Sequence, residues 1–451
     1  MKIDKSKIIY LSLFLIILLF SVLLYTQISK TDKLYNYDSW HHLYFTEHGE
    51  PSEFFTDTIK THDSELKSPY KTFLRSEIYL LHLITGISIY KLFEFGSIFL
   101  RMLYLLMLFI VVHLFTKNKQ VSLLMTILIF SSSYFVWRSF IVFPENLILV
   151  YFLLIIWSLQ NYGHKLLCNY LSTLMVSIIA VSYFHPATLI YLSLIIFSYI
   201  SHYIINNQYN ALKQVLVHSL LSILFIIPNI TNIFQKLIET IFKNVGDFSP
   251  YGQIAKEMVQ YTPPGLFDYI GYIGSLLLVL LVFSLISIMF QLKKHSQLLI
   301  LFITSLLMSF GTWFHIYVPT NRMQAYLFLP LVLLVSIYLS ENIFSNKDRY
   351  VLYILSMVII LSVFSVLKIS PWFALWHGET EIGNYLNNNY VAGNLYFFER
   401  DLIIEHFNYN YPSSIVIEAD KANFIITNVK QKYKDYLIIK SYGNYYILEK
   451  K

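Results

Sequence analysis

Long apolar runs recur from one end of the chain to the other. The first, residues 8–28, is uncharged and has the roughly 20 residues that a helix needs to cross about 30 Å of hydrocarbon. It follows Lys2, Lys5 and Lys7, and because no small-residue cleavage site follows Thr26, we expect an uncleaved span. Further runs of this kind predict spans at about 98–116, 120–137, 141–160, 169–184, 187–205, 214–232, 269–291, 297–315, 323–342 and 350–369. The pattern predicts an all-α polytopic membrane protein with about 11 transmembrane helices.

The connections between these runs differ in charge. If the N-terminus is cytoplasmic, the inner connections are 117–120, 161–168, 206–213, 292–296 and 343–349. Together they hold Lys117, Lys119, Lys165, Lys213, Lys293, Lys294, Lys347 and Arg349, against one acid, Asp348. Short basic connections on one side follow the positive-inside rule. We therefore expect a multi-pass protein of the plasma membrane with a cytoplasmic N-terminus.

The outer connections are longer. Residues 29–97 include an amphipathic stretch, Ser76–Phe95, of the kind that lies in the plane of the membrane interface. A second outer loop, about 233–268, has prolines and glycines that interrupt a continuous helix. Long loops on a rigid scaffold often carry function. Residues 1–370 are thus predicted to form a transmembrane domain with its functional side outside.

The pattern changes after residue 370. Short stretches alternate apolar and polar residues at the period of half-buried strands, with a helical pattern near 378–389. The stretches are SSIVIEA (Ser413–Ala419), NFIITNV (Asn423–Val429), DYLIIKS (Asp435–Ser441) and NYYILEK (Asn444–Lys450). Residues 371–451 are predicted to form a small α/β domain, and an odd number of spans puts it outside the membrane.

Composition narrows the class of protein. Charged residues make up 13% of the 451 residues and hydrophobic residues 56%, which excludes a soluble globular enzyme. The net charge of +6 lies largely in short loops, so nucleic-acid binding is not expected. A single cysteine, Cys168, rules out a disulfide framework.

Four polar clusters lie at the ends of predicted spans. They are NYDSWHHLYF (Asn36–Phe45), WRSFIVFPEN (Trp137–Asn146), FHP (Phe184–Pro186) and FHIYVPTNR (Phe314–Arg322). The topology places all four on the outer face, although none of them was used to set it. Ionisable groups are costly near a bilayer, so their gathering on one face favours a site there.

The residue types in these clusters suit group transfer at a phosphate. A carboxylate, Asp38 or Glu145, can take a proton or hold a metal, and Arg138 and Arg322 can bind phosphate through two parallel hydrogen bonds. Each has a plainer alternative. Asp38 could be an ordinary loop acid, Glu145 could mark a helix start after Pro144, and both arginines could anchor to lipid headgroups.

The histidines are weaker candidates. His185 and His315 are more readily explained by hydrogen bonds within the helix bundle than by metal binding. His41 and His42 are adjacent, so they point to different sides of a helix or strand and are no metal pair by spacing. A divalent cation such as Mg²⁺ or Mn²⁺ is permitted by Asp38 and Glu145 but is not required.

Taken together, the motifs resemble those of the GT-C superfamily of membrane glycosyltransferases. YDSWHHL (Tyr37–Leu43) is similar to the D-x-W/Y-x-H motif of oligosaccharyltransferase catalytic subunits. FPEN (Phe143–Asn146) sits where these enzymes and the protein O-mannosyltransferases carry a second acidic motif. NRMQAYLFLPL (Asn321–Leu331) resembles the arginine-containing span that binds the carrier phosphate. The W-W-D-Y-G motif of oligosaccharyltransferases does not occur in 371–451.

The resemblance implies transfer of a sugar from a polyprenyl- or dolichyl-phosphate carrier to a glycan, lipid or protein acceptor on the outer face. It implies catalytic roles for Asp38 and Glu145, and donor phosphate binding by Arg322 and Arg138. Trp40, His41, His42, His185 and His315 would shape the site. Two other classes stay open: a transporter or flippase for lipid-linked sugars, and a structural or receptor protein. An oligosaccharyltransferase-like enzyme is a further alternative.

Overall fold

The structure is a computed structural model of the whole chain. It describes residues 5–28, 43, 46–47, 58–60, 65–67, 73–132, 144–161, 166–182, 186–221, 273–311, 320–344, 357–358, 360–361, 363, 395–397, 423–427, 435–442 and 445–450. The chain divides into two compact units. Unit 1 comprises Met1–Leu24, Ile98–Ser139 and Pro144–Ile369, and unit 2 comprises Tyr25–Ser97, Phe140–Phe143 and Ser370–Lys451.

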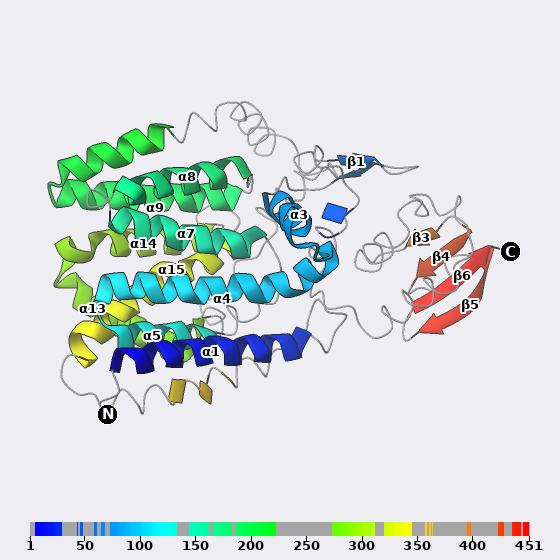
Figure 1. Ribbon diagram of the computed structural model, residues 1–451, viewed down its shortest axis with the longest axis horizontal. Coiled ribbons are helices and arrows are strands. Elements are labelled where there is room, and N and C mark those ends of the chain that lie inside the picture. Colours follow the sequence, from blue (N-terminus) through cyan, green and yellow to red (C-terminus); the bar gives the residue numbers. More distant parts are fainter. Residues whose placement is uncertain are drawn as a thin grey trace. The chain divides into compact units, whose positions relative to one another are not determined.

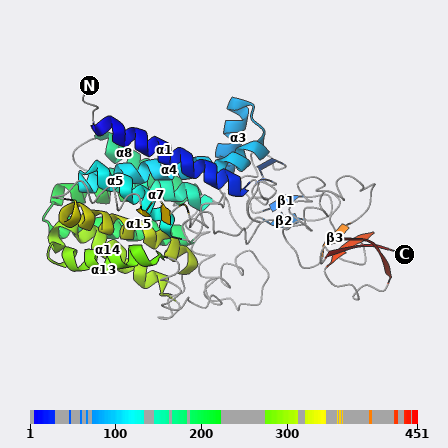
Figure 2. The same cartoon turned by 90° about the horizontal axis from the view of Figure 1, so that it is seen from below.

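Unit 1 is helical, and its helices run broadly alongside one another in both views (Figures 1 and 2). They are α1 (Lys5–Ile28), α4 (Ile89–Thr116), α5 (Lys119–Leu128), α7 (Pro144–Gln160), α8 (Leu166–Ser182), α9 (Pro186–Ile205), a helical stretch at 209–221, α13 (Ser275–Met289), α14 (Leu292–Ser309) and α15 (Thr320–Tyr338). The helix α14 packs against α15 and α9, α7 against α8, and α13 against α15. Each of these helices lies on a predicted apolar run.

Several helices are apolar enough to cross a membrane. Within the described residues three reach the length of a span, at Lys7–Thr26, Ile98–Thr116 and Met323–Ile343. Shorter apolar helices occupy Lys119–Leu128, Leu147–Gln160, Ile190–Ile205 and Leu276–Met289. The prediction of an integral membrane protein is therefore confirmed, while the number of about 11 spans stays a prediction.

Burial separates the central helix from a peripheral one. In the window of Met323–Ile343, 83% of the residues are buried, against 22% in that of Lys7–Thr26. Along α1, large apolar side chains such as Leu11 and Phe14 are exposed. An apolar face of this size is stable in lipid and not in water. Thus α15 lies in the core of unit 1, and the exposed face of α1 suits contact with lipid.

The third predicted span, 120–137, is described from its start as far as Ser132. It begins as α5, where the side chain of Asn118 caps the helix by accepting from the backbone N–H groups of Gln120 at 2.9 Å and Val121 at 3.2 Å. The helix tightens to a 3₁₀ turn, η2 (Ile129–Ser131), and the described segment ends at Ser132.

In unit 2, the predicted amphipathic stretch Ser76–Phe95 is helical but broken. It consists of α3 (Phe73–Thr85) and the start of α4, and the segments Arg75–Thr85 and Ile89–Gly96 are bent by 119°. Gly86 adopts φ +69°, a conformation that glycine tolerates at a helix end, and its N–H donates to the carbonyl of His82 at 2.8 Å. The break follows from this glycine.

The strands of unit 2 form two sheets. One is an antiparallel pair, β1 (Thr58–Lys60) with β2 (Glu65–Lys67). The other has the order β3-β4-β6-β5, in which β3 pairs parallel with β4 and the other pairs are antiparallel. Its strands are β3 (Leu395–Phe397), β4 (Phe424–Thr427), β5 (Tyr436–Tyr442) and β6 (Tyr445–Lys450).

Three of these strands lie where the alternating pattern predicted them. Within them, Ile425, Ile447 and Leu448 are buried, whereas Leu437 and Ile438 are exposed. The predicted strand Ser413–Ala419 and the helical pattern at 378–389 lie outside the described residues. The assignment of 371–451 as a separate external domain stays a prediction.

Candidate functional site

Three of the four predicted clusters coincide with the first residues of helices in unit 1. Glu145 is the second residue of α7, which begins at Pro144. His185 directly precedes α9, which begins at Pro186, and Arg322 is the third residue of α15. A proline at the first helical position is favourable because its missing N–H would have no partner there. The sequence therefore places each cluster at a helix start.

The three helices are held together by aromatic rings shortly after these starts. Phe152 of α7, Tyr191 of α9 and Tyr326 of α15 form an aromatic trio, with ring centroids 4.9 Å, 5.3 Å and 4.9 Å apart in the pairs Phe152–Tyr191, Phe152–Tyr326 and Tyr191–Tyr326. All three side chains are fully buried. Such tilted and edge-to-face pairs add to the stability that burial gives.

Hydrogen bonds reinforce the aromatic trio. The Tyr191 hydroxyl donates to the main-chain carbonyl of Tyr326 at 2.9 Å. The hydroxyls of Thr188 and Tyr326 are 3.3 Å apart. Further along, the Tyr203 hydroxyl donates to the carbonyl of Leu159 at 2.7 Å, so α9 and α7 run in the same direction.

The positions of the trio show that the helices start at one end of the bundle. Phe152, Tyr191 and Tyr326 lie eight, five and six residues after the first residue of their helices. At about 1.5 Å per residue, all three starts are about 8 to 12 Å beyond the trio. The helix α15 runs the same way, because Glu341 beyond its end contacts Lys294 of α14, and Gln297 of α14 lies 3.4 Å from Gln160 at the end of α7. The first turns of α7, α9 and α15 therefore share one end of unit 1, which we call the motif end.

The opposite end, which we call the basic end, gathers the predicted inner connections. Glu341, in the π-helical turn η4 (Leu339–Ile343), accepts from Lys294 Nζ at 2.5 Å and from Gln291 Nε2 at 3.1 Å. The Nε2 of His295 lies 3.6 Å from the same carboxylate. Burial lowers the pKa of His295, and this effect outweighs the attraction of Glu341.

Other contacts tie further connections to the basic end. Asn206 Nδ2 donates to the carbonyl of Lys293 at 3.0 Å, and the Ser340 hydroxyl donates to the carbonyl of Thr116 at 3.2 Å. The Lys119 ammonium lies 4.7 Å from the centre of the Tyr10 ring, near the start of α1. The helix starts with predicted site residues and the basic connections thus occupy opposite ends, as the topology requires.

The rest of the predicted site lies outside the described residues: Asp38, Trp40, His41, His42, Arg138, His185 and His315. For Glu145 and Arg322 the structure gives the helical position of the backbone alone. The roles of all nine residues stay predictions. Among the described residues no three His, Cys, Asp or Glu side chains come together, and the metal assignment to Asp38 and Glu145 is untested.

One ionisable residue outside the predicted motifs is conspicuous in the structure. Arg101, in the span Ile98–Thr116 of α4, is 2% exposed, and its guanidinium carbon lies 5.4 Å from the centre of the Tyr104 ring. A lone arginine inside an apolar run was the available signal, because buried charges in spans often mark function.

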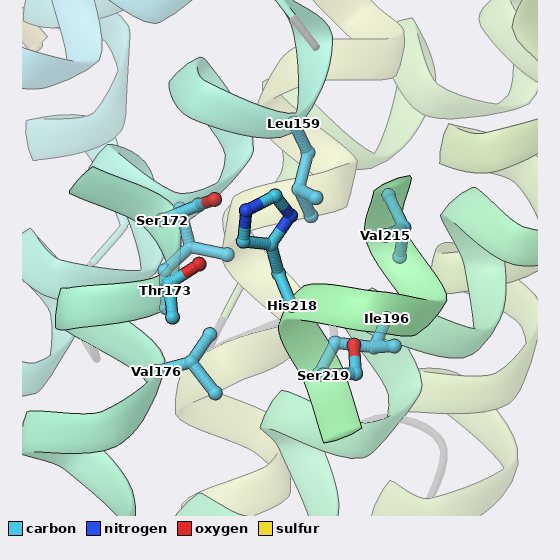
Figure 3. Close-up of a pocket in the computed structure, with 9 residues that line it drawn as sticks. Leu159, Ser172, Thr173, Val176, Ile196, Val215, His218 and Ser219 are labelled. Carbon is cyan, nitrogen blue, oxygen red and sulfur yellow. The ribbon is translucent and has the colours of Figure 1, made fainter. Parts of the chain in front are cut away.

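A small cavity lies away from the motif end. His218 points into it from the helix at 209–221, facing Ser172 and Thr173 of α8 (Figure 3). The His218 ring nitrogen Nδ1 is 2.8 Å from the carbonyl of Gln214. The cavity measures about 20 Å³, room for one water molecule. It is too small for a sugar or a carrier phosphate.

The fold is shared with solved membrane enzymes. ArnT from Cupriavidus metallidurans, solved with undecaprenyl phosphate, matches with a TM-score of 0.67 at 8% identity, over 99% of this chain and 98% of that one. The oligosaccharyltransferase AglB from Archaeoglobus fulgidus, solved with an inhibitory peptide and a dolichol-phosphate, gives a TM-score of 0.55 at 10% identity, over 91% and 65%.

A second structure of the Archaeoglobus fulgidus oligosaccharyltransferase is tethered to an acceptor peptide with the NVT sequon. It gives a TM-score of 0.58 at 11% identity, and the match covers 93% of this chain and 65% of that one. The chain thus spans about 65% of the length of these oligosaccharyltransferases. No protein-family model and no curated protein sequence matches it. The predicted resemblance is confirmed at the level of the fold, which this chain shares with ArnT and AglB.

Proposed function

We propose that the chain is a membrane glycosyltransferase that moves one sugar unit from a polyprenyl- or dolichyl-phosphate carrier to an acceptor on the outer face. The acceptor is a glycan, a lipid or a protein. The observation that carries the proposal is the common end of α7, α9 and α15, where Glu145 and Arg322 begin two parallel helices of a GT-C fold. ArnT and AglB were solved with undecaprenyl phosphate and dolichol-phosphate, which supports this donor class.

The remaining expectations complete the proposal. About 11 spans would carry the N-terminus on the cytoplasmic side of the plasma membrane and 371–451 outside. The carrier tail would lie among membrane lipids and its headgroup at the motif end. Transfer of a single sugar is favoured over an oligosaccharide-to-asparagine reaction because 371–451 lacks the W-W-D-Y-G motif.

The reaction we propose is an inverting displacement. Asp38 takes the proton of the acceptor hydroxyl as its oxygen attacks the anomeric carbon. The bond between that carbon and the phosphate oxygen breaks, and the carrier phosphate leaves from the opposite face with the electron pair. Arg322, with Arg138, stabilises the charge that develops on the phosphate. Preorganised cations contribute most because they need no rearrangement when the charge forms.

The other candidate residues support these steps. Glu145 and His185 orient the acceptor or hold a divalent cation, for which carboxylate oxygens suit Mg²⁺ or Mn²⁺. Trp40, His41, His42 and His315 shape the sugar pocket. None of the steps above depends on the cation, so the proposal stands with or without it.

A transporter of lipid-linked sugars is the alternative that one described residue favours. A transporter needs polar groups within its spans, and Arg101 is such a group. Two results together would establish this alternative: the wild type moves the lipid-linked sugar between leaflets without removing the sugar from its carrier, and the Arg101→Met variant no longer moves it. The clustering of Glu145 and Arg322 at one end argues for chemistry at one surface instead.

The proposal is tested with purified protein in vesicles, a panel of polyprenyl-phosphate sugars with labelled sugar, and cell-envelope acceptors. We expect wild type to transfer label, and Asp38→Asn to bind carrier but lose transfer by at least about 10³-fold, as expected for loss of a general base. Asp32→Asn removes another acid of the same loop and is the matched control. Equal losses in both variants, or movement of carrier between leaflets without transfer, would overturn the proposal.

A further inference from the structure

A proline interrupts the hydrogen bonding of α15 just below the aromatic trio. Pro330 lies inside the helix and has no N–H, so it cannot donate to the carbonyl four residues earlier, that of Tyr326. A proline inside a helix also crowds that carbonyl, and such positions are where helices commonly bend. The Tyr326 carbonyl therefore lacks its usual helical donor, and a donor from another helix can take that place.

The Tyr191 hydroxyl supplies this donor. It donates to the Tyr326 carbonyl at 2.9 Å, from α9. Its ring is fully buried and is held between the rings of Phe152 and Tyr326, which fixes where the hydroxyl points. A buried carbonyl without a donor is costly, so the bond opposes any movement of α15 away from α9.

The geometry of α15 makes this bond important for its first turns. The half of the helix before Pro330 lacks one of the bonds that would make it continuous with the half after it. Arg322 lies eight residues before Pro330, or about 12 Å along the axis. A tilt of about 10° at Pro330 would therefore move the backbone of Arg322 by about 2 Å.

We propose that Tyr191 is a positioning residue, which holds the half of α15 before Pro330 in place and thereby sets the placement of Arg322 at the motif end. This inference rests on the proposed function, since that function gives Arg322 its role at the carrier phosphate. Displacements of about 1 Å in such a group can cost a hundredfold in rate. Tyr191 would then affect transfer without touching donor or acceptor.

Two substitutions separate the bond from the packing. Tyr191→Phe keeps the ring in the aromatic trio and removes the donor. Pro330→Ala returns an N–H to the Tyr326 carbonyl and makes the hydroxyl redundant. If the bond acts as proposed, Pro330→Ala rescues Tyr191→Phe. A purely structural effect of the lost hydroxyl would give no such rescue.

Tyr199→Phe is the matched control. Tyr199 is buried on the same helix, and its hydroxyl is 3.4 Å from the carbonyl of Ile156 and 3.3 Å from Gln160 Oε1. The Ile156 carbonyl belongs to α7, where no proline removes its helical donor, the N–H of Gln160. Loss of this hydroxyl should leave α15 unchanged.

The four variants and wild type are compared in lipid nanodiscs by amide hydrogen exchange of residues 320–329 and by transfer rate. We expect Tyr191→Phe to raise exchange in 320–329 by about tenfold, the effect of one lost bond to a buried carbonyl. We expect its kcat for transfer to fall by about tenfold or more, with a smaller change in the acceptor KM. In the double variant both values should return to those of Pro330→Ala.

The exchange data decide the proposal independently of the transferase assay. Unchanged exchange in Tyr191→Phe, or a double variant that exchanges like Tyr191→Phe alone, would overturn it. Increased exchange and full rescue in a protein whose wild type transfers no sugar would instead overturn the proposed function, and would leave Tyr191 as the residue that holds the first half of α15 in place.

Discussion

The hydroxyl of Tyr191 donates to the main-chain carbonyl of Tyr326 across 2.9 Å, although the two residues are 135 positions apart. The bond joins α9 to α15 at the carbonyl that Pro330 leaves without a helical donor. With Phe152 it aligns three parallel helices whose first residues carry predicted site motifs. The functional hypothesis for the motif end depends on this alignment.

Arg322 should be needed for carrier phosphate binding. Arg322→Gln is expected to lower kcat/KM for the lipid-linked donor by about 10² to 10³-fold, because a cation opposite a developing charge is lost. Arg322→Lys should recover only part of this, since lysine cannot make two parallel bonds to phosphate. Lys293→Gln, which removes an exposed cation at the basic end, is the control. Similar losses in Lys293→Gln and Arg322→Gln would show a general charge effect.

Phe152 should contribute strongly to the stability of unit 1. Phe152→Ala removes the ring that contacts both Tyr191 and Tyr326, and is expected to lower the free energy of unfolding by about 3 to 5 kcal/mol. Phe283→Ala, at a half-exposed position of α13, should cost less than about 1 kcal/mol. Unfolding followed by tryptophan fluorescence in mixed micelles measures both. Equal losses of unfolding free energy in the two variants would show that the aromatic trio does not stabilise unit 1 more than an exposed position does.

Stability should fall in mild acid because of His295. Burial lowers its pKa in the folded protein below the ordinary value of 6.5, so the unfolded chain binds the proton more readily. The stabilisation is complete above pH 6.5 and is lost as the pH falls from 6.5 toward the lowered pKa. Of the groups beside His295, the Glu341 carboxylate raises its pKa and the Lys294 ammonium lowers it, and the net direction, set by burial, is downward. His202 lies close enough to His295 that a charge on one disfavours a charge on the other.

His295→Gln tests this dependence, measured as the melting temperature between pH 8 and pH 5. We expect the variant to lose part of the decrease that wild type shows below pH 6.5, because glutamine does not titrate. Lys294→Gln retains His295 and should keep the decrease. A decrease of the same size in wild type and His295→Gln would refute the assignment to His295.

The cap of α5 gives a local prediction. Asn118→Ala removes the acceptor for the N–H groups of Gln120 and Val121, and should lower the free energy of unfolding by about 1 kcal/mol. Asn118→Ser keeps a capping oxygen and should cost only a few tenths of that. Chemical denaturation of the two variants compares them. A serine variant as unstable as the alanine variant would exclude capping as the cause.

Local patterns in the sequence determined most of the secondary structure of the described residues. The apolar runs predicted α1, α7, α9, α13, α14 and α15 because run length is a direct requirement of a bilayer. Alternation predicted β4, β5 and β6 because successive side chains of a strand face opposite sides. The short motifs at the ends of the runs led to the expected resemblance in fold to ArnT and AglB.

Tertiary structure alone decided which helix faces meet. A helix that is apolar on every side gives no sequence signal for the face that packs against protein, so the meeting of Phe152, Tyr191 and Tyr326 could not be predicted. The same holds for the burial of Arg101 beside Tyr104 and for the strand order β3-β4-β6-β5. Hydropathy is a property of each segment, whereas these contacts join residues far apart in the chain, and only the packing of the whole bundle selects them.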